Sequence, residues 1–278
     1  MEFTKMHGAG NDFIIINNIE EKIPVSKLSD LAEKLCHRRL SIGADGLMVV
    51  DHPDFGGDYK MRFYNADGSL GEMCGNGARC IARYGHEKGL AGDIQKIETI
   101  AGLVIGYKVT EDMYRIRLND VTTMKDMTVS ALGKEYPCVY VELGDPGIPH
   151  AVVQVEGLAQ MKAKDLIDLG VALRYCDAFP KGANVNFYDI VGEDELVELT
   201  YERGVEDFTL ACGTGTGSVV ASLTKKGIVS GTDVKVNVPG GELYITLNEE
   251  GLFLTASDSE LTIRAFIEKK EISNVEAT

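Results

Sequence analysis

The amino-acid sequence predicts an α+β fold, and three observations lead to this prediction. Short strand-like segments, separated by turns that contain glycine, occur throughout the chain. Some of them, such as residues 114–118, alternate apolar and polar side chains, and this period of two is typical of antiparallel strands with one solvent-exposed face. Helical patterns are few and do not alternate regularly with strands, as they would in a doubly wound parallel sheet.

The expected elements follow these patterns along the chain. In the first half, strand-like segments lie near residues 2–7, 12–17, 46–50, 59–65, 103–109 and 113–118. In the second half they lie near 137–143, 151–155, 184–190, 195–202, 234–239, 243–247, 252–256 and 261–267. Helical patterns lie near 26–38, 77–88, 158–175 and 215–226. The second and fourth of these helices each follow a glycine cluster.

A length of 278 residues is typical of about two domains. The polar stretch 121–128 lies near the middle of the chain and is the predicted boundary. We therefore expect an N-terminal lobe over residues 1–125 and a C-terminal lobe over 126–265. The charged tail, residues 266–278, is expected to return to the N-terminal lobe.

The composition argues against several classes of protein. Forty-three acidic residues against 28 basic ones leave a formal net charge of −15, whereas proteins that bind nucleic-acid backbones normally present a basic face. No apolar run approaches the length of a membrane span, and no signal peptide is expected at the N-terminus. The six cysteines are therefore expected to be reduced thiols in a cytoplasmic protein.

Two similar glycine-flanked cysteines are the most informative motif. Cys74 is followed by Gly75-Asn76-Gly77, and Cys212 is followed by Gly213-Thr214-Gly215. The two cysteines are separated by about half of the chain, and each stands directly before a helical pattern. Two homologous halves, each with one cysteine at a helix N-terminus, explain this arrangement economically.

This placement indicates acid–base chemistry. The helix macrodipole and the free N–H groups of the first turn lower the cost of forming a thiolate. The same N–H groups bind anions such as a carboxylate, and the glycines allow a substrate to approach the backbone. One thiol can remove a proton from one face of a carbon while the other delivers a proton to the opposite face, which inverts a stereocentre without a metal or an organic cofactor.

The remaining cysteines are interpreted as structural. Cys36, Cys138 and Cys176 are expected to be small buried apolar side chains, and Cys80 is expected to share a helix with Cys74 without sharing its face. The cysteine and histidine spacings do not match those of a zinc site, and a redox C-x-x-C motif is absent from the sequence.

At these residues the sequence resembles the diaminopimelate epimerase family, and the resemblance runs almost from end to end. The matching blocks are Phe3–Phe13, Ile42–Gly46, Arg62–Ser69, Glu72–Cys80, Asn184–Phe187, Glu202–Gly204, the segment around Cys212, and Val238–Gly241. Together these blocks are highly specific, although a single one would not be.

The resemblance implies two pseudo-symmetric lobes, each a β-barrel-like sheet around a central helix. It implies that Cys74 and Cys212 are the acid/base pair. Substrate-binding residues would be Asn11, Asn65, Gly75, Asn76, Asn184, Glu202, Arg203, Gly213 and Thr214. The residue types agree with these roles, since the guanidinium of Arg203 suits a carboxylate and the carboxylate of Glu202 suits an ammonium group.

The sequence departs from the family at three places. The family usually reads Gly-Asn-Pro-His before a strand, whereas this chain reads Gly144-Asp145-Pro146-Gly147-Ile148-Pro149-His150. We therefore assign no substrate contact to Asp145, and His150 is expected either to support the site or to be a structural histidine. The loop 205–210 is one residue longer and more acidic than usual, and Gly46 stands where some members have glutamine.

The sequence thus predicts a cytoplasmic, cofactor-independent isomerase that converts LL-diaminopimelate to meso-diaminopimelate. Its partner is expected to be a small amino acid, with no metal, nucleic acid or membrane involved. A homodimer is a further expectation. A racemase of another α-amino acid, such as histidine or lysine, is the alternative on the same scaffold. A more distant alternative is a dinucleotide-binding protein, because Gly213 and Gly215 begin a glycine-rich helix start and Asp233 follows 20 residues after Gly213. A non-catalytic binding module with the same fold is the third class.

Overall fold

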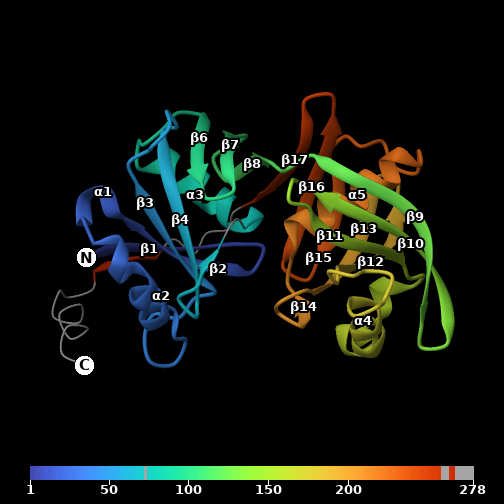
Figure 1. Cartoon of the computed structure of the whole chain (residues 1–278). Helices are drawn as coiled ribbons and strands as arrows, with labels where there is room; N and C mark the ends of the chain where they lie inside the picture. The colour runs from blue at the N-terminus through green and yellow to red at the C-terminus, as the bar shows by residue number, and fades with distance from the viewer. Residues whose placement is uncertain (72–73, 258–262, 267–278) are drawn as a thin grey trace. The chain divides into compact units, whose positions relative to one another are not determined.

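The computed structural model describes residues 1–71, 74–257 and 263–266. The chain forms two compact units (Figure 1). The N-terminal unit consists of Met1–Ile116 with the described part of Ser257–Thr278, and the C-terminal unit consists of Arg117–Ala256. Strands predominate and α-helices are few in both units, so the prediction of an α+β fold is confirmed. Within the described ranges, no helix has the length and apolar character needed to cross a membrane.

The N-terminal unit is one mixed sheet with a helix on each face. Its elements are β1 (Glu2–Gly8), β2 (Asn11–Asn17), α1 (Asn18–Glu21), η1 (Val25–Lys27), α2 (Leu28–Cys36), β3 (Gly46–Asp51), β4 (Tyr59–Asn65), β5 (Leu70–Gly71), α3 (Gly75–Glu87), β6 (Ile94–Thr99), β7 (Gly102–Lys108), β8 (Met113–Arg117) and β18 (Ile263–Phe266). The strand order is β18-β1-β2-β3-β4-β6-β7-β8, with β5 added to β4. The β2–β3 and β4–β6 pairs are parallel and the others antiparallel.

The C-terminal unit repeats this arrangement. Its elements are β9 (Val121–Ala131), β10 (Lys134–Leu143), β11 (Ile148–Gln154), η2 (Leu158–Gln160), η3 (Ala163–Leu166), α4 (Ile167–Arg174), β12 (Asn184–Gly192), β13 (Glu195–Glu202), β14 (Asp207–Thr209), α5 (Gly213–Lys225), β15 (Val234–Val238), β16 (Gly241–Asn248) and β17 (Gly251–Ser257). The strand order is β9-β10-β11-β12-β13-β15-β16-β17, with β14 added to β13. Here the β11–β12 and β13–β15 pairs are parallel.

The two units are therefore topological copies of each other. Helix α3 contacts β1, β2 and β7, and α5 contacts the corresponding strands β10, β11 and β16. Because these strands come from opposite ends of each sheet order, each sheet curves around its helix. Helices α2 and α4 pack on corresponding strands as well, β3 and β4 in one unit and β12 and β13 in the other. This agrees with the pseudo-symmetric repeat that the cysteine motifs predicted.

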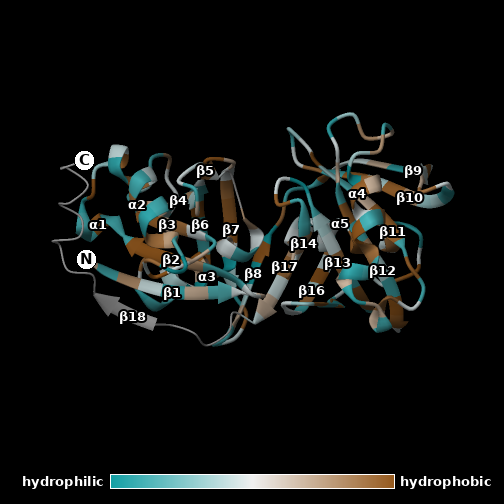
Figure 2. Ribbon diagram, turned by 90° about the horizontal axis from the view of Figure 1, so that it is seen from below, coloured by the Kyte–Doolittle hydropathy of each residue, from teal (hydrophilic) through white to brown (hydrophobic). Residues whose placement is uncertain are grey.

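Apolar side chains hold α2 and α4 on the sheets. In the N-terminal unit, Leu28, Leu31 and Leu35 lie on one face of α2 and pack into a core with strand residues such as Ile14 and Leu47. In the C-terminal unit, Leu169 and Leu173 of α4 pack with β-strand residues such as Val185 and Phe187. Figure 2 shows the same distribution, with apolar residues along strands such as β3 and hydrophilic residues in many loops.

The structure corrects two expectations. The segment 158–175 is not one helix, because Lys162 has an extended backbone and separates η2 from η3 and α4. Its apolar residues share one core, and that shared burial produced the helical pattern. The polar stretch 121–128, which was not predicted as a strand, belongs to β9 at the sheet edge, where most side chains are exposed or partly exposed.

The units divide after Ile116 and Ala256, within about ten residues of the predicted ends at 125 and 265 and on their N-terminal side. The reason is that β9 pairs along its whole length with β10 of the C-terminal unit. The strand expected at 261–267 is present as β18 and pairs antiparallel with β1. The rest of the tail, 267–278, lies outside the described residues.

Candidate active site

Each motif cysteine stands at the N-cap of the helix that its sheet surrounds. Cys74 precedes α3 with φ −129° and ψ 119°, and Cys212 precedes α5 with φ −126° and ψ 100°. The carbonyl of Cys74 accepts the N–H of Ala78 at 2.8 Å, and that of Cys212 accepts the N–H of Thr216 at 2.9 Å. The two thiols therefore occupy equivalent positions, and the helices begin at Gly75 and Gly213, two residues before the predicted starts.

This geometry leaves N–H groups of each first helical turn without a partner inside the helix. The glycine three residues after each cysteine is required by close packing. A Cβ atom on Gly77 would lie 1.9 Å from Cε of Met48, and one on Gly215 would lie 2.1 Å from Oδ1 of Asn186. Each helix start therefore packs tightly on its sheet and presents a cysteine next to backbone donors that suit an anion.

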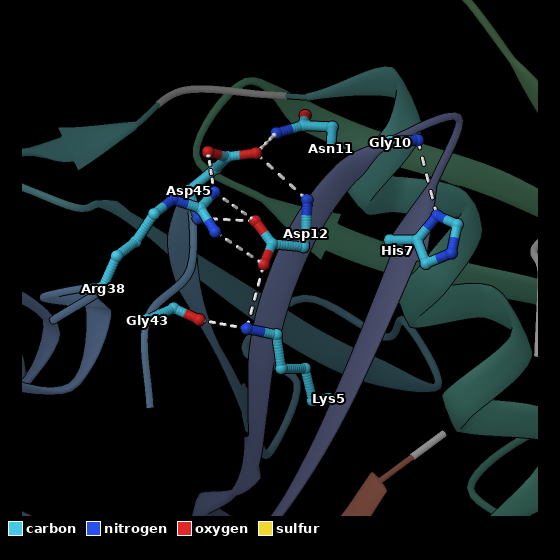
Figure 3. A network of polar contacts seen from close by, with 8 residues as sticks. All are labelled: Lys5, His7, Gly10, Asn11, Asp12, Arg38, Gly43 and Asp45. Carbon is cyan, nitrogen blue, oxygen red and sulfur yellow. Dashed lines mark hydrogen bonds and ion pairs between the residues drawn. The ribbon is translucent and has the colours of Figure 1, made fainter. Parts of the chain in front are cut away.

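In the N-terminal unit, Cys74 is half-buried and faces Asn11 at the start of β2. The thiol donates to Oδ1 of Asn11 at 3.3 Å. The amide nitrogen of Asn11 donates to Oδ2 of Asp45 at 2.7 Å, and the backbone N–H of Asp12 donates to the same oxygen at 3.1 Å. Asp45 thereby orients the Asn11 amide so that its carbonyl oxygen faces the sulfur (Figure 3 shows the Asp45–Asn11 contact).

The cationic side chains of Arg38 and Lys5 hold the carboxylates of Asp12 and Asp45 in place (Figure 3). Arg38 contacts Asp12 through two nitrogens at 2.6 and 3.1 Å, and it contacts Asp45 at 2.6 Å. Lys5 pairs with Asp12 at 2.9 Å. Burial alone would raise the pKa of Asp12, but the hydrogen bonds from Arg38 and Lys5 outweigh it and lower the pKa to about 2.

In the C-terminal unit, Cys212 is more enclosed, with 9% of the residue exposed. Its sulfur lies 3.6 Å from the hydroxyl of Thr214. Burial and the negative charge of Glu202 raise the pKa of the Cys212 thiol, although hydrogen bonds from Thr214 and from the N–H of Gly215 oppose this. Desolvation thus outweighs the hydrogen bonds by which the helix N-terminus favours a thiolate at Cys212.

Three of the predicted substrate-binding residues lie together beside this helix start. Asn184 begins β12, and its Oδ1 accepts the backbone N–H of Arg203 at 2.8 Å. Its amide nitrogen donates to the carbonyl of Pro149 at 3.3 Å. Glu202 ends β13, and burial raises its pKa although a hydrogen bond with Thr209 opposes the shift. A half-buried carboxylate of this kind suits an ammonium group, which would lower its pKa again.

Residues 144–147 of the altered segment form the turn between β10 and β11, and residues 148–150 begin β11. Asp145 is exposed in this turn, whereas His150 is fully buried in β11. Nδ1 of His150 lies 3.2 Å from the amide nitrogen of Asn186. Burial, assisted by the charge of Arg203, lowers the pKa of His150 to about 3, so this histidine is neutral at physiological pH.

The other predicted residues are placed as follows. Asn76 is buried in the first turn of α3. Asn65 is exposed at the end of β4, where its amide nitrogen donates to the hydroxyl of Ser69 at 2.9 Å. The structure therefore brings Asn11 to Cys74, and Thr214 to Cys212, while the contact found for Asn65 is within its own turn.

The longer acidic loop 205–210 is held on α4. Oε1 of Glu206 accepts from two nitrogens of Arg174 at 2.8 and 3.2 Å and from the N–H of Gly204 at 2.9 Å. The carbonyl of Glu206 accepts the hydroxyl of Tyr201 at 2.7 Å. These hydrogen bonds therefore fix the longer loop in place next to Glu202 and Arg203.

Sequence reasoning missed the polar residues behind the cysteines. Asp45 and Asn186 lie inside blocks that match the family, so the signal was present although their contacts were not predictable. Thr216 lies in the segment around Cys212, whereas Glu198 and Thr200 gave no such signal, because a charged or polar residue inside a strand pattern is ordinarily solvent-exposed. In the structure all three are buried.

The dinucleotide alternative does not fit this geometry. The acidic residue of a dinucleotide site follows a strand, near the start of the glycine-flanked helix. Asp233 instead precedes β15, beyond the C-terminal end of α5, and its carboxylate accepts the hydroxyl of Thr246 at 2.7 Å. In the described part of the chain, no group of three or more His, Cys, Asp and Glu side chains is arranged to hold a metal ion.

Comparison with known structures finds the same fold in other proteins. The structure is similar to that of a probable proline racemase from Agrobacterium radiobacter K84 with bound carbonate, with a TM-score of 0.68 and 16% sequence identity, covering 96% of this chain and 92% of that chain. At this level of identity the similarity shows the fold.

The family follows from sequence comparison. The diaminopimelate epimerase of Aquifex aeolicus (strain VF5) is 40% identical over 271 residues, covering 92% of this chain and 94% of the relative. That of Archaeoglobus fulgidus is 36% identical over 269 residues, covering 93% and 94%. The family described as diaminopimelate epimerase matches residues 3–122 and 144–258. The chain belongs to the diaminopimelate epimerase family.

Proposed function

We propose that this chain interconverts LL- and meso-diaminopimelate, with Cys74 and Cys212 as the acid/base pair. The observation that carries the proposal is the repeat of one cysteine geometry: two topologically equivalent units each present a thiol at the N-cap of the enclosed helix. The family membership of the chain supports the same activity.

The reaction needs two proton transfers at one carbon. One sulfur, as a thiolate, takes the proton from the α-carbon, and the electron pair of the broken C–H bond moves toward the carboxylate. The other sulfur, as a thiol, delivers its proton to the opposite face of the carbon. When the inverted amino acid leaves, the first sulfur is a thiol and the second is a thiolate. The reverse reaction restores the original protonation states.

The carboxylate collects charge during this step, so backbone donors should stabilise it. The first turns that begin at Gly75 and Gly213 offer such donors, with Asn76 and Thr214 at their second positions. Burial raises the pKa of Cys212, which favours its thiol form and supports a role as the proton donor. No metal or cofactor is required by these steps.

The remaining residues would hold the polar ends of the substrate. Arg203 supplies a guanidinium for a carboxylate, and Glu202 supplies a carboxylate for an ammonium group. Asn184 links Arg203 to Pro149 through its side chain, so it fixes the backbone at which these groups stand. Asn11 and Asn65 would contact the substrate from the N-terminal unit, and His150 would support the site.

Deuterium exchange tests the activity. In D₂O, incubation with LL-diaminopimelate should place deuterium at the α-carbon, while L-histidine and L-lysine should stay unlabelled. Label in histidine or lysine instead would favour the alternative racemase, and no label in any amino acid tried would reject the isomerase class. Cys74→Ala and Cys212→Ala should each abolish turnover, and Cys176→Ala is the matched control because Cys176 is half-exposed and outside both motifs.

We also propose that the protein works in the cytoplasm on a free small-molecule amino acid, without nucleic acid or membrane. The structure gives all six cysteines as thiols rather than disulfides, which supports a reducing compartment. The homodimer stays a prediction, which light scattering of the purified protein would test. Both catalytic thiols come from one chain, so the proposed chemistry does not depend on a second copy.

A further inference from the structure

The C-terminal unit contains a buried carboxyl group that the mechanism above does not use. Glu198 lies in β13 with no exposed surface. Its Oε2 lies 2.6 Å from the hydroxyl of Thr216, and its Oε1 lies 3.3 Å from the hydroxyl of Thr200. Burying a carboxyl group next to neutral hydroxyls is costly compared with burying an apolar side chain. A purely structural position would therefore favour an apolar residue.

Glu198 is the centre of a continuous hydrogen-bonded chain that ends at Cys212. The hydroxyl of Thr216 lies 3.0 Å from the carbonyl oxygen of Cys212. On the other side, the hydroxyl of Thr200 lies 3.1 Å from Oδ1 of Asn186, whose amide nitrogen is 3.2 Å from Nδ1 of His150. The chain joins three strands of the sheet, β11, β12 and β13, to the first turn of α5.

Counting hydrogens assigns the protonation state of this chain. Each threonine hydroxyl has one hydrogen but two acceptor oxygens within reach, since Thr216 faces Glu198 and the Cys212 carbonyl, and Thr200 faces Glu198 and Asn186. If Oε2 of Glu198 carries a proton, it donates to Thr216, which is then free to donate to the carbonyl of Cys212. Thr200 donates its single hydrogen either to Asn186 or to Oε1 of Glu198, so the neutral acid supplies three hydrogens for these four contacts, whereas the carboxylate supplies only two.

The surroundings agree with this neutral form. Burial raises the pKa of Glu198 to about 7, although the hydrogen bonds with Thr216 and Thr200 oppose the shift. The amide of Asn186 then donates to Nδ1 of His150, which places the imidazole hydrogen on Nε2. His150 is neutral as well, because burial lowers its pKa. In this neutral form Glu198 donates toward Cys212 through Thr216, and Asn186 donates toward His150 on the other side.

The N-terminal unit provides an internal comparison. The strand registers and the cysteine positions make Phe13, Met48, Met61, Phe63 and Ala78 the counterparts of His150, Asn186, Glu198, Thr200 and Thr216. Every polar member of the chain in the C-terminal unit therefore corresponds to an apolar residue at Cys74. The same architecture forms without these hydrogen bonds, so the fold does not require them.

We propose that Glu198 is a positioning residue for Cys212, which it holds through Thr216. Its carboxyl group ties the first turn of α5 to the sheet, and the Cys212 carbonyl then receives both the N–H and the hydroxyl of Thr216. This fixes the extended backbone of Cys212 and with it the direction of the sulfur. Cys74 is held from its side-chain end instead, by Asn11. The inference rests on the proposed function, in which Cys212 transfers a proton.

Two substitutions separate positioning from folding and from proton transfer. Glu198→Met introduces the residue that the N-terminal unit has at this position, so the protein should fold. Glu198→Gln keeps a donor toward Thr216 and an acceptor toward Thr200 but cannot ionise. We expect Glu198→Met to lower kcat about ten-fold with little change in KM, because small displacements of a reacting group are costly. Glu198→Gln should stay within about three-fold of the parent.

A second measurement does not depend on turnover. The rate at which iodoacetamide alkylates Cys212 is followed by peptide mass spectrometry in a Cys74→Ala background, with Cys74 in a Cys212→Ala background as the control. Glu198→Met should raise the alkylation rate of Cys212 several-fold, because it loosens the first turn of α5, and should leave the alkylation rate of Cys74 unchanged. Glu198→Gln should keep the parental rate at Cys212. If the parent fails to label diaminopimelate, the proposed function fails while this measurement still decides the positioning.

Two results would overturn the proposal. Parental kcat and alkylation rate in Glu198→Met would mean that the carboxyl group does not position Cys212. A loss in Glu198→Gln as large as that in Glu198→Met would mean that the carboxyl group acts by ionising or by transferring a proton. Circular dichroism and thermal unfolding of each variant confirm that the comparison is made between folded proteins.

Discussion

At the scale of single residues, the two cysteines share a backbone geometry but differ in their neighbours. Cys74 is half-buried, and its sulfur faces an amide whose orientation Asp45 determines. Cys212 is buried, and its sulfur is next to a hydroxyl and an N–H group. Since an amide presents an acceptor on one side and a donor on the other, the orientation of Asn11 decides which of them meets the Cys74 thiol.

Asp45→Ala should disturb this orientation. Without the acceptor for its nitrogen, the Asn11 amide can rotate, and we expect kcat/KM to fall about ten-fold while the fold is retained. Asp54→Ala is the control, because it also removes an exposed acid that pairs with a cation, Lys60, away from Cys74. Equal kinetics for Asp45→Ala and the control would show that Asp45 does not orient Asn11.

At the scale of elements, the helix starts depend on how closely α3 and α5 approach their sheets. The glycine at the fourth position of each motif permits this approach. The two neighbours differ, however, because Gly77 faces the terminal methyl of Met48, whereas Gly215 faces the oxygen of Asn186, which is already hydrogen-bonded to Thr200. A methionine end can turn aside, but the Asn186 oxygen cannot move without breaking its hydrogen bond.

Gly215→Ala should therefore cost more stability than Gly77→Ala. We expect the free energy of unfolding to fall by about 2 kcal/mol or more for Gly215→Ala, in the range of overpacked interiors, and by less for Gly77→Ala. Gly92→Ala is the control, because a Cβ atom there would meet nothing within 4 Å. Urea unfolding measures all three, and a Gly215→Ala protein as stable as the control would contradict the close packing described here.

At the scale of the whole molecule, the chain consists of two copies of one topology, and the last described strand completes the first copy. β18 pairs with β1 in the place where β9 pairs with β10. The N-terminal copy is also tied by the charged cluster of Lys5, Asp12, Arg38 and Asp45. Its stability should therefore depend on pH in a way that the charge states of this cluster determine.

Asp12 should contribute stability that is lost in acid. Its pKa is about 2 in the folded protein and about 4 in an unfolded chain. Because the folded value is the lower one, the contribution is fully present above pH 4 and disappears as the pH falls toward 2. After allowance for the exposure of Arg38 we expect about 1 kcal/mol. Urea unfolding between pH 5 and 2.5 should show a smaller loss of unfolding free energy for Asp12→Asn than for the parent. Asp145→Asn is the control and should behave like the parent. Equal losses in Asp12→Asn and the parent would contradict this assignment.

Local patterns were sufficient for much of the fold. Strands such as β4 and β13 lie where the sequence predicts them, because alternation of apolar and polar side chains reflects the two faces of a strand directly. The two cysteine-led helices were predictable because glycine clusters and apolar spacing are local signals. Strand β9 was not predictable, since an exposed edge strand has the composition of a loop.

The sequence by itself therefore determined the α+β class, the duplication and the place of each thiol at a helix start, all of which are written in neighbouring residues. Only the tertiary structure decided that Asp45 orients Asn11 and that Glu198 is buried behind Cys212. These contacts join residues 34 and 18 positions apart in the chain. Whether a carboxylate is exposed, paired with a cation or buried as a neutral acid depends on which strands and helices surround it, and no short segment of sequence contains that information.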